Sequence, residues 1–359
     1  MDTKPVRTMI RQHILALLLI SPALLTAADP AQAEENPHHS HMQHESHSQH
    51  QVSDVQLGHI HHVHKAGSWM FEYRFMRMEM EDLLAGSNKV SATDVAKMGS
   101  IYKNASGGTY MMAPTDMTMD MHMLMGMYSQ TDDLSWMLML NYLDNEMNMV
   151  AMSGAKSVMN SSGLGDVELG AMYKLYDKDA SQLLANLGLS FPTGSINKIN
   201  SQGILPYAMQ LGSGTYDLKP SVTYRNNFDR WSMGFQGSYT FRLNKNDQNY
   251  DLGNRANGQA WLKVNPFKGA SISGRVTFSD WQSINGSARD ITAMRRNMSP
   301  TFDDLNSGGQ RWDASIGISY MFESGHMLGA EYGLPIQQDL DGLQMRVKQV
   351  YNLSWQYIF

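Results

Sequence analysis

The sequence predicts an exported all-β protein, a transmembrane antiparallel β-barrel of about twelve strands that carries a disordered, His-rich N-terminal arm. Three observations support this fold class. The chain begins like a signal peptide, it alternates apolar and polar residues from Ser68 onward, and its alternating segments are joined by short and long connections in turn. We therefore divide the chain into a signal peptide (1–33), a flexible arm (34–67) and a barrel (68–359).

The first segment has the three parts of a secretory signal peptide. Basic residues come first, then an apolar run, then a small-residue cleavage site: Lys4, Arg7 and Arg11, Ile14–Ile20, and Ala31–Ala33. A membrane anchor would need about 18 uninterrupted apolar residues, and Pro22 ends the run before that length. We expect cleavage before Glu34 and export from the cytoplasm.

The composition is compatible with a membrane barrel. The chain has 359 residues and no Cys, so no disulfide framework holds it. Its mean hydropathy of -0.38 resembles that of a soluble protein. A membrane barrel has an unremarkable average, however, because lipid-facing and lumen-facing residues alternate. The net charge of -6 and the pI of about 6.1 argue against nucleic acid as a partner, because a basic surface is missing.

The last segment has the clearest alternation. Its apolar residues share one parity: Leu343, Met345, Val347, Tyr351, Leu353, Trp355, Tyr357 and Phe359. Polar residues such as Asn352, Ser354 and Gln356 lie between them. One face suits lipid and the other suits water, and a closed barrel satisfies every backbone hydrogen bond between strands. The terminal Phe resembles the sorting signal of outer-membrane barrels.

Similar segments along the chain give about twelve strands, an even number as in bacterial barrels. Their expected starts are near Ser68, Met117, Leu134, Gly165, Leu183, Thr215, Trp231, Arg255, Ala270, Arg311, Met327 and Leu343. The expected long loops are Asp82–Thr115, Asn145–Gly163, Thr193–Gly214, Lys245–Asn254 and Trp281–Gly309. A soluble β-sandwich would also alternate, but it would bury the aromatic face. We therefore expect the outer membrane of a Gram-negative bacterium.

Three motifs resemble those of a known family: Gly163–Val167, Phe191–Gly194 and Gly214–Pro220. From about Gly58 to Phe359, the sequence is similar to the outer-membrane "meta-pathway of phenol degradation" family. Its members are usually called transporters, so the resemblance implies a barrel that passes solutes. The stretch His62–Met70 and the Met-rich run after it resemble a Met- and His-rich subgroup associated with copper.

Methionine is concentrated in the first part of the predicted barrel. Of 30 Met residues, 20 lie between Met70 and Met172. A thioether is a soft ligand for Cu(I), and imidazole suits Cu(II), so the two residue types together favour copper over other metals.

Parity predicts which of these side chains face the lumen. Met76, Met78 and Met80 share a face with Glu72 and Arg74, and Met137 and Met139 share one with Ser135 and Asn141. We expect these methionines to point inward, either as metal ligands or as irregular lumen packing. The stripe Met117–Met127 lies opposite Thr118, Asp120 and His122. If the polar face looks inward, this stripe faces lipid and His122 joins the inward methionines as a ligand.

The arm offers ten candidate imidazole ligands: His38, His39, His41, His44, His47, His50, His59, His61, His62 and His64. A disordered tract binds divalent metal weakly, because binding must also order it. The alternatives are a solvated linker, a plug of the lumen, or a gate that responds to pH through histidine.

Three functions are compatible with these features. The first is a transporter or channel, with outer-membrane lipid and a small solute or metal ion as partners. The second is a copper-sequestering outer-membrane protein without transport. The third is a barrel hydrolase, which needs a His general base, and within the predicted barrel only His122 and His326 are present. We expect no enzyme, no catalytic residue and no required cofactor, with copper as the favoured metal ion.

Overall fold

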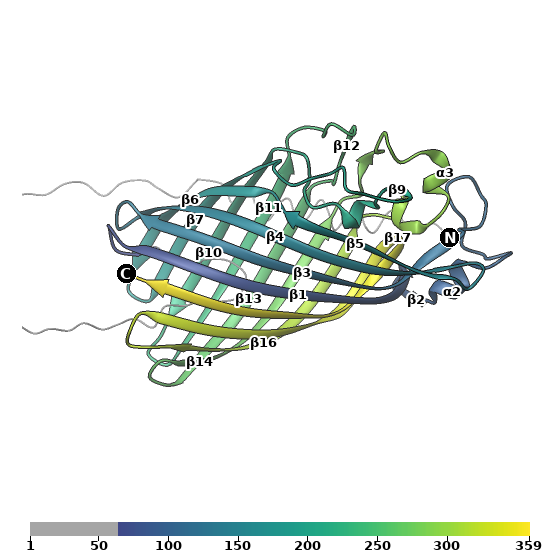
Figure 1. The fold of residues 1–359 in the computed structure, drawn as a ribbon. Coiled ribbons are helices and arrows are strands. Elements are labelled where there is room, and N and C mark those ends of the chain that lie inside the picture. The colour runs from purple at the N-terminus through teal and green to yellow at the C-terminus, as the bar shows by residue number, and fades with distance from the viewer. Residues whose placement is uncertain (1–63) are drawn as a thin grey trace, which may run out of the picture. The chain divides into compact units, whose positions relative to one another are not determined.

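The computed structural model describes residues 64–359. The predicted signal peptide and the arm up to residue 63 lie outside the described residues. The described chain forms a sheet of 13 strands in which all but β2 (Asn88–Val90) and β5 (Lys156–Leu164) form a closed antiparallel ring (Figure 1). The ring elements are β1 (Trp69–Gly86), β3 (Met112–Ser129), β4 (Leu134–Ala151), β6 (Val167–Lys178), β7 (Ser181–Phe191), β10 (Asp217–Asn227), β11 (Trp231–Arg242), β13 (Arg255–Phe267), β14 (Ala270–Trp281), β16 (Gly309–Met321) and β17 (His326–Ile358).

The last element, β17, supplies two neighbouring strands of the barrel wall. Its 33 residues would extend to roughly 110 Å if straight, several times the thickness of a bilayer. Met327–Leu340 pairs with β16, whereas Leu340–Ile358 pairs with β1 and closes the ring. The chain reverses near Gly342, which has a φ of 76°. A closed ring in which every neighbouring pair is antiparallel needs an even number of strands. Because β17 supplies two of them, the eleven ring elements make the twelve strands that were predicted.

The outer face of the ring is apolar. On β4, Trp136, Leu138 and Leu140 are exposed, and they alternate with the inward-facing Met137 and Met139. Apolar residues of β11 and β16 are likewise exposed on the outer face: Trp231, Phe235, Phe241, Trp312, Ile316, Ile318 and Tyr320. Lipid-facing apolar residues around a polar interior define an outer-membrane barrel. Among residues 64–359, no helix is long and apolar enough to cross a membrane.

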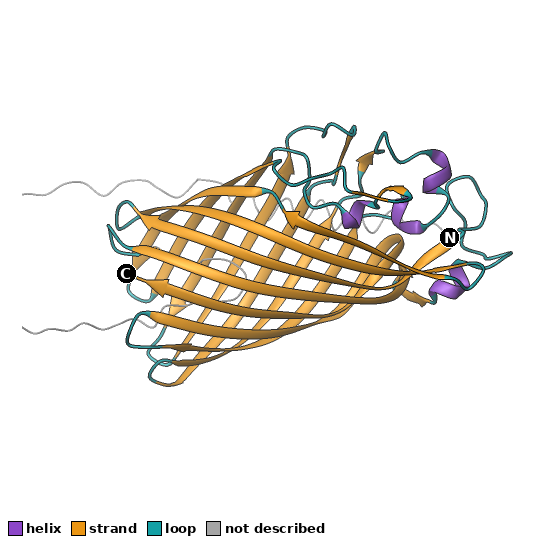
Figure 2. Cartoon of the chain, in the orientation of Figure 1, coloured by secondary structure: helices purple, strands orange, loops and turns teal. Residues whose placement is uncertain are grey.

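The two rims of the barrel differ, as predicted. Short turns and the C-terminus lie at one rim, called here the inner rim, and the long connections with their helices lie at the other (Figure 2). In outer-membrane barrels the long loops are extracellular, so this second rim is the outer mouth. Its elements are α2 (Ala92–Val95), β8 (Ile199–Asn200), β9 (Gly203–Ile204), η1 (Tyr207–Met209), β12 (Tyr250–Asp251), β15 (Asn285–Gly286), α3 (Ala293–Arg296) and η2 (Pro300–Phe302).

Two local predictions are wrong. The segment Asn145–Gly163, predicted as a loop, continues β4 and turns back as β5, with Gly154 at a φ of 83° in the tight turn. Leu343, Met345 and Val347 do not share the outward face of Tyr351. A bulge opposite Met80 reverses the parity of β17 there, so Leu343 and Val347 are buried.

Candidate functional site

Methionines line one side of the barrel interior. Several are direct cross-strand partners: Met76 and Met121, Met78 and Met119, Met80 and Met117, Met117 and Met147, Met125 and Met139, Met127 and Met137, and Met147 and Met159. Partners of this kind have Cβ atoms about 4.5–5.5 Å apart. We call the whole inward set the methionine ladder: Met70, Met76, Met78, Met80, Met117, Met119, Met121, Met123, Met125, Met127, Met137, Met139, Met147 and Met159.

The stripe Met117–Met127 faces the lumen, and the prediction that it faces lipid is wrong. Met117, Met125 and Met127 are buried, whereas Leu124 on the other face of β3 is 57% exposed. The prediction assumed that the polar face of a strand looks inward. On β3 Asp120 and His122 lie outside, and Arg77 and Tyr73 of β1 are their hydrogen-bond partners.

Consequently His122 is not a lumenal ligand. Its Nδ1 lies 2.8 Å from Tyr73 Oη in a hydrogen bond, and its ring packs on Phe75. Beside it on the same face, Asp120 accepts a hydrogen bond of 2.7 Å from Arg77 Nε. Pairing of this kind offsets the cost of placing polar groups outside water.

The other predicted barrel ligands do lie on the inward face. Met76, Met78, Met80, Met137 and Met139 are half-buried there. Metal binding by these residues stays a prediction. Among the described residues, no three His, Asp or Glu side chains are grouped so that they could hold a metal ion. Of the predicted arm ligands only His64 is described, and the nine from His38 to His62 lie outside the described residues.

His64 lies in the inner part of the lumen. His64 precedes β1 in the chain. The charged residue that affects its pKa is nevertheless Arg225, an inward residue of β10 on the other side of the ring. Burial and this nearby cation lower the pKa of His64 to about 4. Arg225 itself donates a hydrogen bond of 2.7 Å to Gln182 Oε1. The chain just before β1 therefore enters the lumen.

Much of the remaining lumen wall is polar, and oppositely charged residues face each other along it. The ion pairs are Arg74 with Glu72, Lys219 with Glu168, Arg242 with Asp217, and Arg275 with Glu331. Glu72 also accepts a hydrogen bond of 2.8 Å from Gln356 across the seam between β1 and β17. Opposite charges offset the cost of burial. The two signs are mixed, so the lumen does not strongly favour cations or anions.

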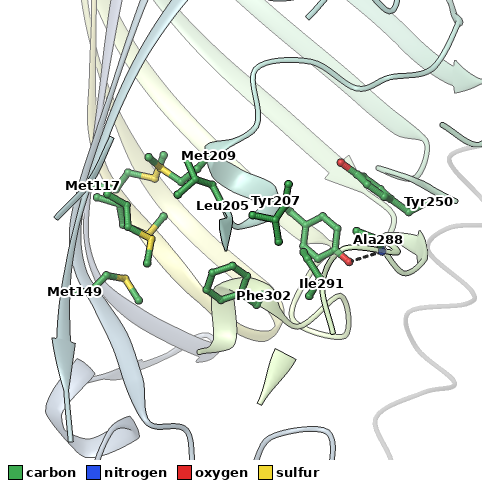
Figure 3. Packing of buried hydrophobic residues seen from close by; sticks show 12 residues of the cluster. Met117, Met149, Leu205, Tyr207, Met209, Tyr250, Ala288, Ile291 and Phe302 are labelled. Atoms are coloured by element: carbon green, nitrogen blue, oxygen red, sulfur yellow. Dashed lines mark hydrogen bonds between the residues drawn. The ribbon is translucent and has the colours of Figure 1, made fainter. Parts of the chain in front are cut away.

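The outer mouth is covered by three loops that pack against the methionine ladder (Figure 3). Loop residues and strand methionines form one buried cluster, called here the outer cluster: Met117, Met147, Met149, Met159, Ile204, Leu205, Tyr207, Met209, Tyr250, Ala288, Ile291 and Phe302. Tyr207 Oη accepts a hydrogen bond of 3.0 Å from the Ala288 amide. Burial raises the pKa of Tyr250 to about 12. Two of the three loops start on the opposite side of the ring, between β11 and β13 and between β14 and β16, so together the loops span the mouth.

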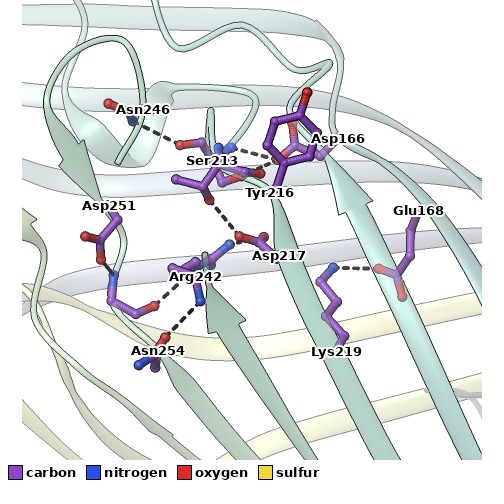
Figure 4. Close-up of polar contacts among 12 residues, drawn as sticks. Asp166, Glu168, Ser213, Tyr216, Asp217, Lys219, Arg242, Asn246, Asp251 and Asn254 are labelled. Carbon is purple, nitrogen blue, oxygen red and sulfur yellow. Dashed lines mark hydrogen bonds and ion pairs between the residues drawn. The ribbon is translucent and has the colours of Figure 1, made fainter. Parts of the chain in front are cut away.

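The three sequence motifs meet where β5 gives way to β6 (Figure 4). The Asp166 carboxylate accepts hydrogen bonds from Gly194 N at 2.9 Å, from Ser213 N at 2.8 Å and from Ser213 Oγ at 2.7 Å. Asp217 accepts one from Thr215 and pairs with Arg242. The motifs thus fasten both ends of loop 192–216 to the wall, which holds the loop over the outer mouth.

These features define the class of protein. A closed ring of antiparallel strands with an apolar outer face and a polar and thioether interior is a protein of the Gram-negative outer membrane. Residues 103–338 match the family described as "Putative MetA-pathway of phenol degradation", and the chain belongs to this family. The resemblance expected from the motifs is confirmed. The match does not extend to the copper-associated subgroup.

One solved structure shows the same fold. The COG4313 outer membrane channel from Pseudomonas putida F1 is similar to the chain, with a TM-score of 0.60, 15% identity, and coverage of 85% of this chain and 100% of that one. The Pseudomonas putida toluene transporter TodX aligns with a TM-score of 0.42 and 9% identity, covering 82% of this chain and 90% of its own. At 15% identity the first likeness establishes the fold alone, and the TM-score of the second is too low to carry any argument. No curated protein sequence matches the chain.

Proposed function

We propose that the protein is an outer-membrane channel for small solutes. The observation that carries this proposal is the open, two-sided lining of the lumen. Met76, Met78, Met119, Met121 and Met123 face inward and are only half-buried, so the interior beside them is not a dry core. Opposite them lies the ion-paired polar wall. A barrel with only a structural role would gain more from filling this space with packed side chains.

The outer cluster indicates the kind of solute. Thioether and aromatic side chains make favourable contacts with aromatic rings, and methionine adapts its shape to irregular guests. The outer cluster places Met147 and Met209 beside Tyr207 and Phe302 at the mouth. Small aromatic or other apolar molecules therefore suit the entrance. The family description, with its link to phenol degradation, agrees with this class. The narrow lumen of a twelve-crossing barrel disfavours large solutes.

The test is conductance of the refolded full-length protein in planar bilayers, together with permeation of phenol and of a trisaccharide into liposomes. We expect discrete conductance steps and entry of phenol but not of the sugar. The variant Asp166→Ala is measured beside the wild type. It should release loop 192–216, so it should conduct even if this loop keeps the wild-type channel closed. Absence of conductance and of phenol entry in both proteins would overturn the proposal.

A second candidate is a copper-binding outer-membrane protein without transport. It is favoured by the separation of Met from other apolar residues on the two faces of the wall, which is developed below. The hydrolase candidate depended on His122 or His326 as a base. His122 lies on the outer face, and His326 at the inner rim stacks on Tyr357 at 4.4 Å, so neither meets a nucleophile in the lumen.

A further inference from the structure

The apolar residues of β1, β3 and β4 are sorted by face. Within these three strands the exposed outer positions hold aromatic residues and Leu: Trp69, Phe71, Leu124, Trp136, Leu138, Leu140 and Tyr142. From Met70 to Met80, Met117 to Met127 and Ser135 to Met147, the inward apolar positions hold the methionine ladder and a single Leu, Leu143. Only nearer the outer rim are other apolar residues of these strands buried, such as Leu83 and Val150. Leu and Met have similar volume and replace each other in cores at small cost. Burial of apolar surface alone therefore gives no reason for the sorting, and the thioether sulfur is the property that the inward positions share.

One row of the ladder runs straight across four strands. Met80 of β1 is opposite Met117 of β3, which is opposite Met147 of β4, which is opposite Met159 of β5. Neighbouring strands are about 4.7–4.9 Å apart. A Met side chain has three rotatable bonds beyond its Cα. Sulfur atoms from adjacent strands can therefore approach a common ion. We call these four residues the methionine row.

The methionine row is also dry. Met117, Met147 and Met159 are 0–3% exposed, because the outer cluster covers them. Met209 of the covering loop lies in the same cluster and brings a further sulfur to it (Figure 3). Water and hard anions, which compete for a metal ion at an exposed site, are excluded here. Below the row, the pairs Met78 with Met119 and Met76 with Met121 continue toward the middle of the lumen and are more open.

The ligand type selects the ion. Thioethers are neutral and soft, so they bind Cu(I) and similar monovalent ions and bind Mg²⁺, Ca²⁺ and Zn²⁺ poorly. Within residues 64–359, no cluster of three His, Asp or Glu residues offers a harder site for a divalent ion. The lumen carboxylates beside the lower ladder, Glu72 and Glu168, already pair with Arg74 and Lys219.

We propose that the methionine ladder binds soft monovalent metal ions of the Cu(I) and Ag(I) class through thioether sulfur. The methionine row forms the tight site beneath the outer cluster, and the pairs below it form weaker sites along the lumen. The proposal goes beyond the channel function, because it assigns to the lumen wall a metal-binding site that does not depend on transport.

The test uses Ag(I), supplied as silver nitrate in chloride-free buffer, because it needs no reductant. Full-length protein in detergent is dialysed against Ag(I) in the presence of excess Zn(II), which occupies imidazole sites, and bound silver is measured by mass spectrometry. The first variant replaces the row: Met80→Leu, Met117→Leu, Met147→Leu and Met159→Leu. The second replaces the open pairs: Met76→Leu, Met121→Leu, Met78→Leu and Met119→Leu. The matched control is Met233→Leu, on the outer face of β11.

We expect the row variant to bind Ag(I) about tenfold more weakly or worse at the tight site. The pair variant should keep the tight site and bind fewer ions in total, and the control should equal wild type. X-ray absorption of bound silver should detect sulfur neighbours. Heat-modifiable migration confirms that each variant has folded. If either set of variants binds silver as wild type does, or if silver has no sulfur neighbours, the proposal is overturned.

Conductance of the same proteins in potassium salt separates this proposal from the channel function. Silver binding without conductance would leave the metal site standing and remove the channel. Conductance with silver binding unchanged in the variants would leave the channel and remove the metal site.

Discussion

At the scale of the residue, His64 places an imidazole where a positive charge is costly. Burial beside Arg225 lowers its pKa from the ordinary 6.5 to about 4. The folded chain therefore binds this proton less readily than the unfolded chain does. His64 contributes its full stability above pH 6.5, where it is neutral in both states, and that contribution is lost as the pH falls from 6.5 toward 4.

We therefore expect acidification to loosen the chain before β1. The Gly67 amide donates a hydrogen bond of 2.8 Å to Ser129 O and holds this segment to the wall. Between pH 7.5 and pH 5, the amides of residues 65–68 should exchange with deuterium faster than the intrinsic pH effect predicts. In His64→Gln, which cannot be protonated in this range, the excess should disappear. An equal excess in the variant would show that another group is responsible.

The polar residues of β3 explain why the ladder was only half predicted. Alternation along the strand is evident from the sequence, and it correctly separates Met117–Met127 from Asp120 and His122. Which face meets water is not evident, because the polar face is paired with Arg77 and Tyr73 of β1. A strand with polar groups on one face and methionines on the other can be oriented only once its neighbours are known. The orientation of β4 was predicted correctly, because a face that carries Trp136, Leu138 and Leu140 suits only lipid.

At the scale of the element, the two ends of loop 192–216 meet at Gly194 and Gly212, where there is no room for a side chain. A Cβ atom on Gly194 would lie 2.7 Å from Gly212 Cα and 2.8 Å from Leu211 O, both backbone atoms. The two ends of the loop touch at this point, and Asp166 bridges them. The family motifs that were recognised in the sequence thus position a cover over the mouth.

Gly194→Ala should release this loop. The new methyl group forces the two backbone segments apart, at a cost of about 1–3 kcal/mol. Trypsin cleavage at Lys198 in the folded protein should become faster. Gly258→Ala on β13 is the matched control, because a Cβ there meets nothing within 4 Å. Equal cleavage of the two variants would contradict the close contact.

Asp166→Ala should release the same loop by a different route. It removes the acceptor of three hydrogen bonds and leaves the amides of Gly194 and Ser213 without their partner. Such loss costs about 2–4 kcal/mol locally. The open fraction in single-channel recordings should rise. Glu323→Ala, which removes an exposed ion pair with Lys268 far from loop 192–216, should leave the recordings unchanged.

The strand elements were largely predictable, and the exceptions have a physical cause. Turn residues and alternation located the strand starts, including the two arms of β17. The bulge at Lys348 was missed because it is defined only by pairing with β1, where Met80 faces Val347. The β4–β5 hairpin was missed because the polar residues of Asn145–Gly163 resemble a loop. The outer cluster was missed because it joins loops far apart in sequence.

At the scale of the whole molecule, the barrel separates three environments by the parity of its strands. Lipid lies against Leu and aromatic side chains, the lumen is divided between sulfur and paired charges, and the loops of the outer cluster cover the mouth. The separation is sharpest on β4, where Leu138 is 43% exposed on the outer face and Met139, the next residue, points inward opposite Glu168. The same substitution at two neighbouring positions should therefore lower the free energy of unfolding by very different amounts.

Leu138→Lys and Met139→Lys test this directly. Lysine at position 138 would face hydrocarbon between Trp136 and Tyr142, where a lipid-facing charge costs about 2–4 kcal/mol of folding free energy. Lysine at position 139 would meet the Glu168 carboxylate inside the lumen and should cost well under half as much. Unfolding by guanidinium in lipid vesicles, followed by tryptophan fluorescence, measures both. If the two variants were equally destabilised, the inward and outward assignment of β4 would be wrong, and with it the placement of the methionine ladder.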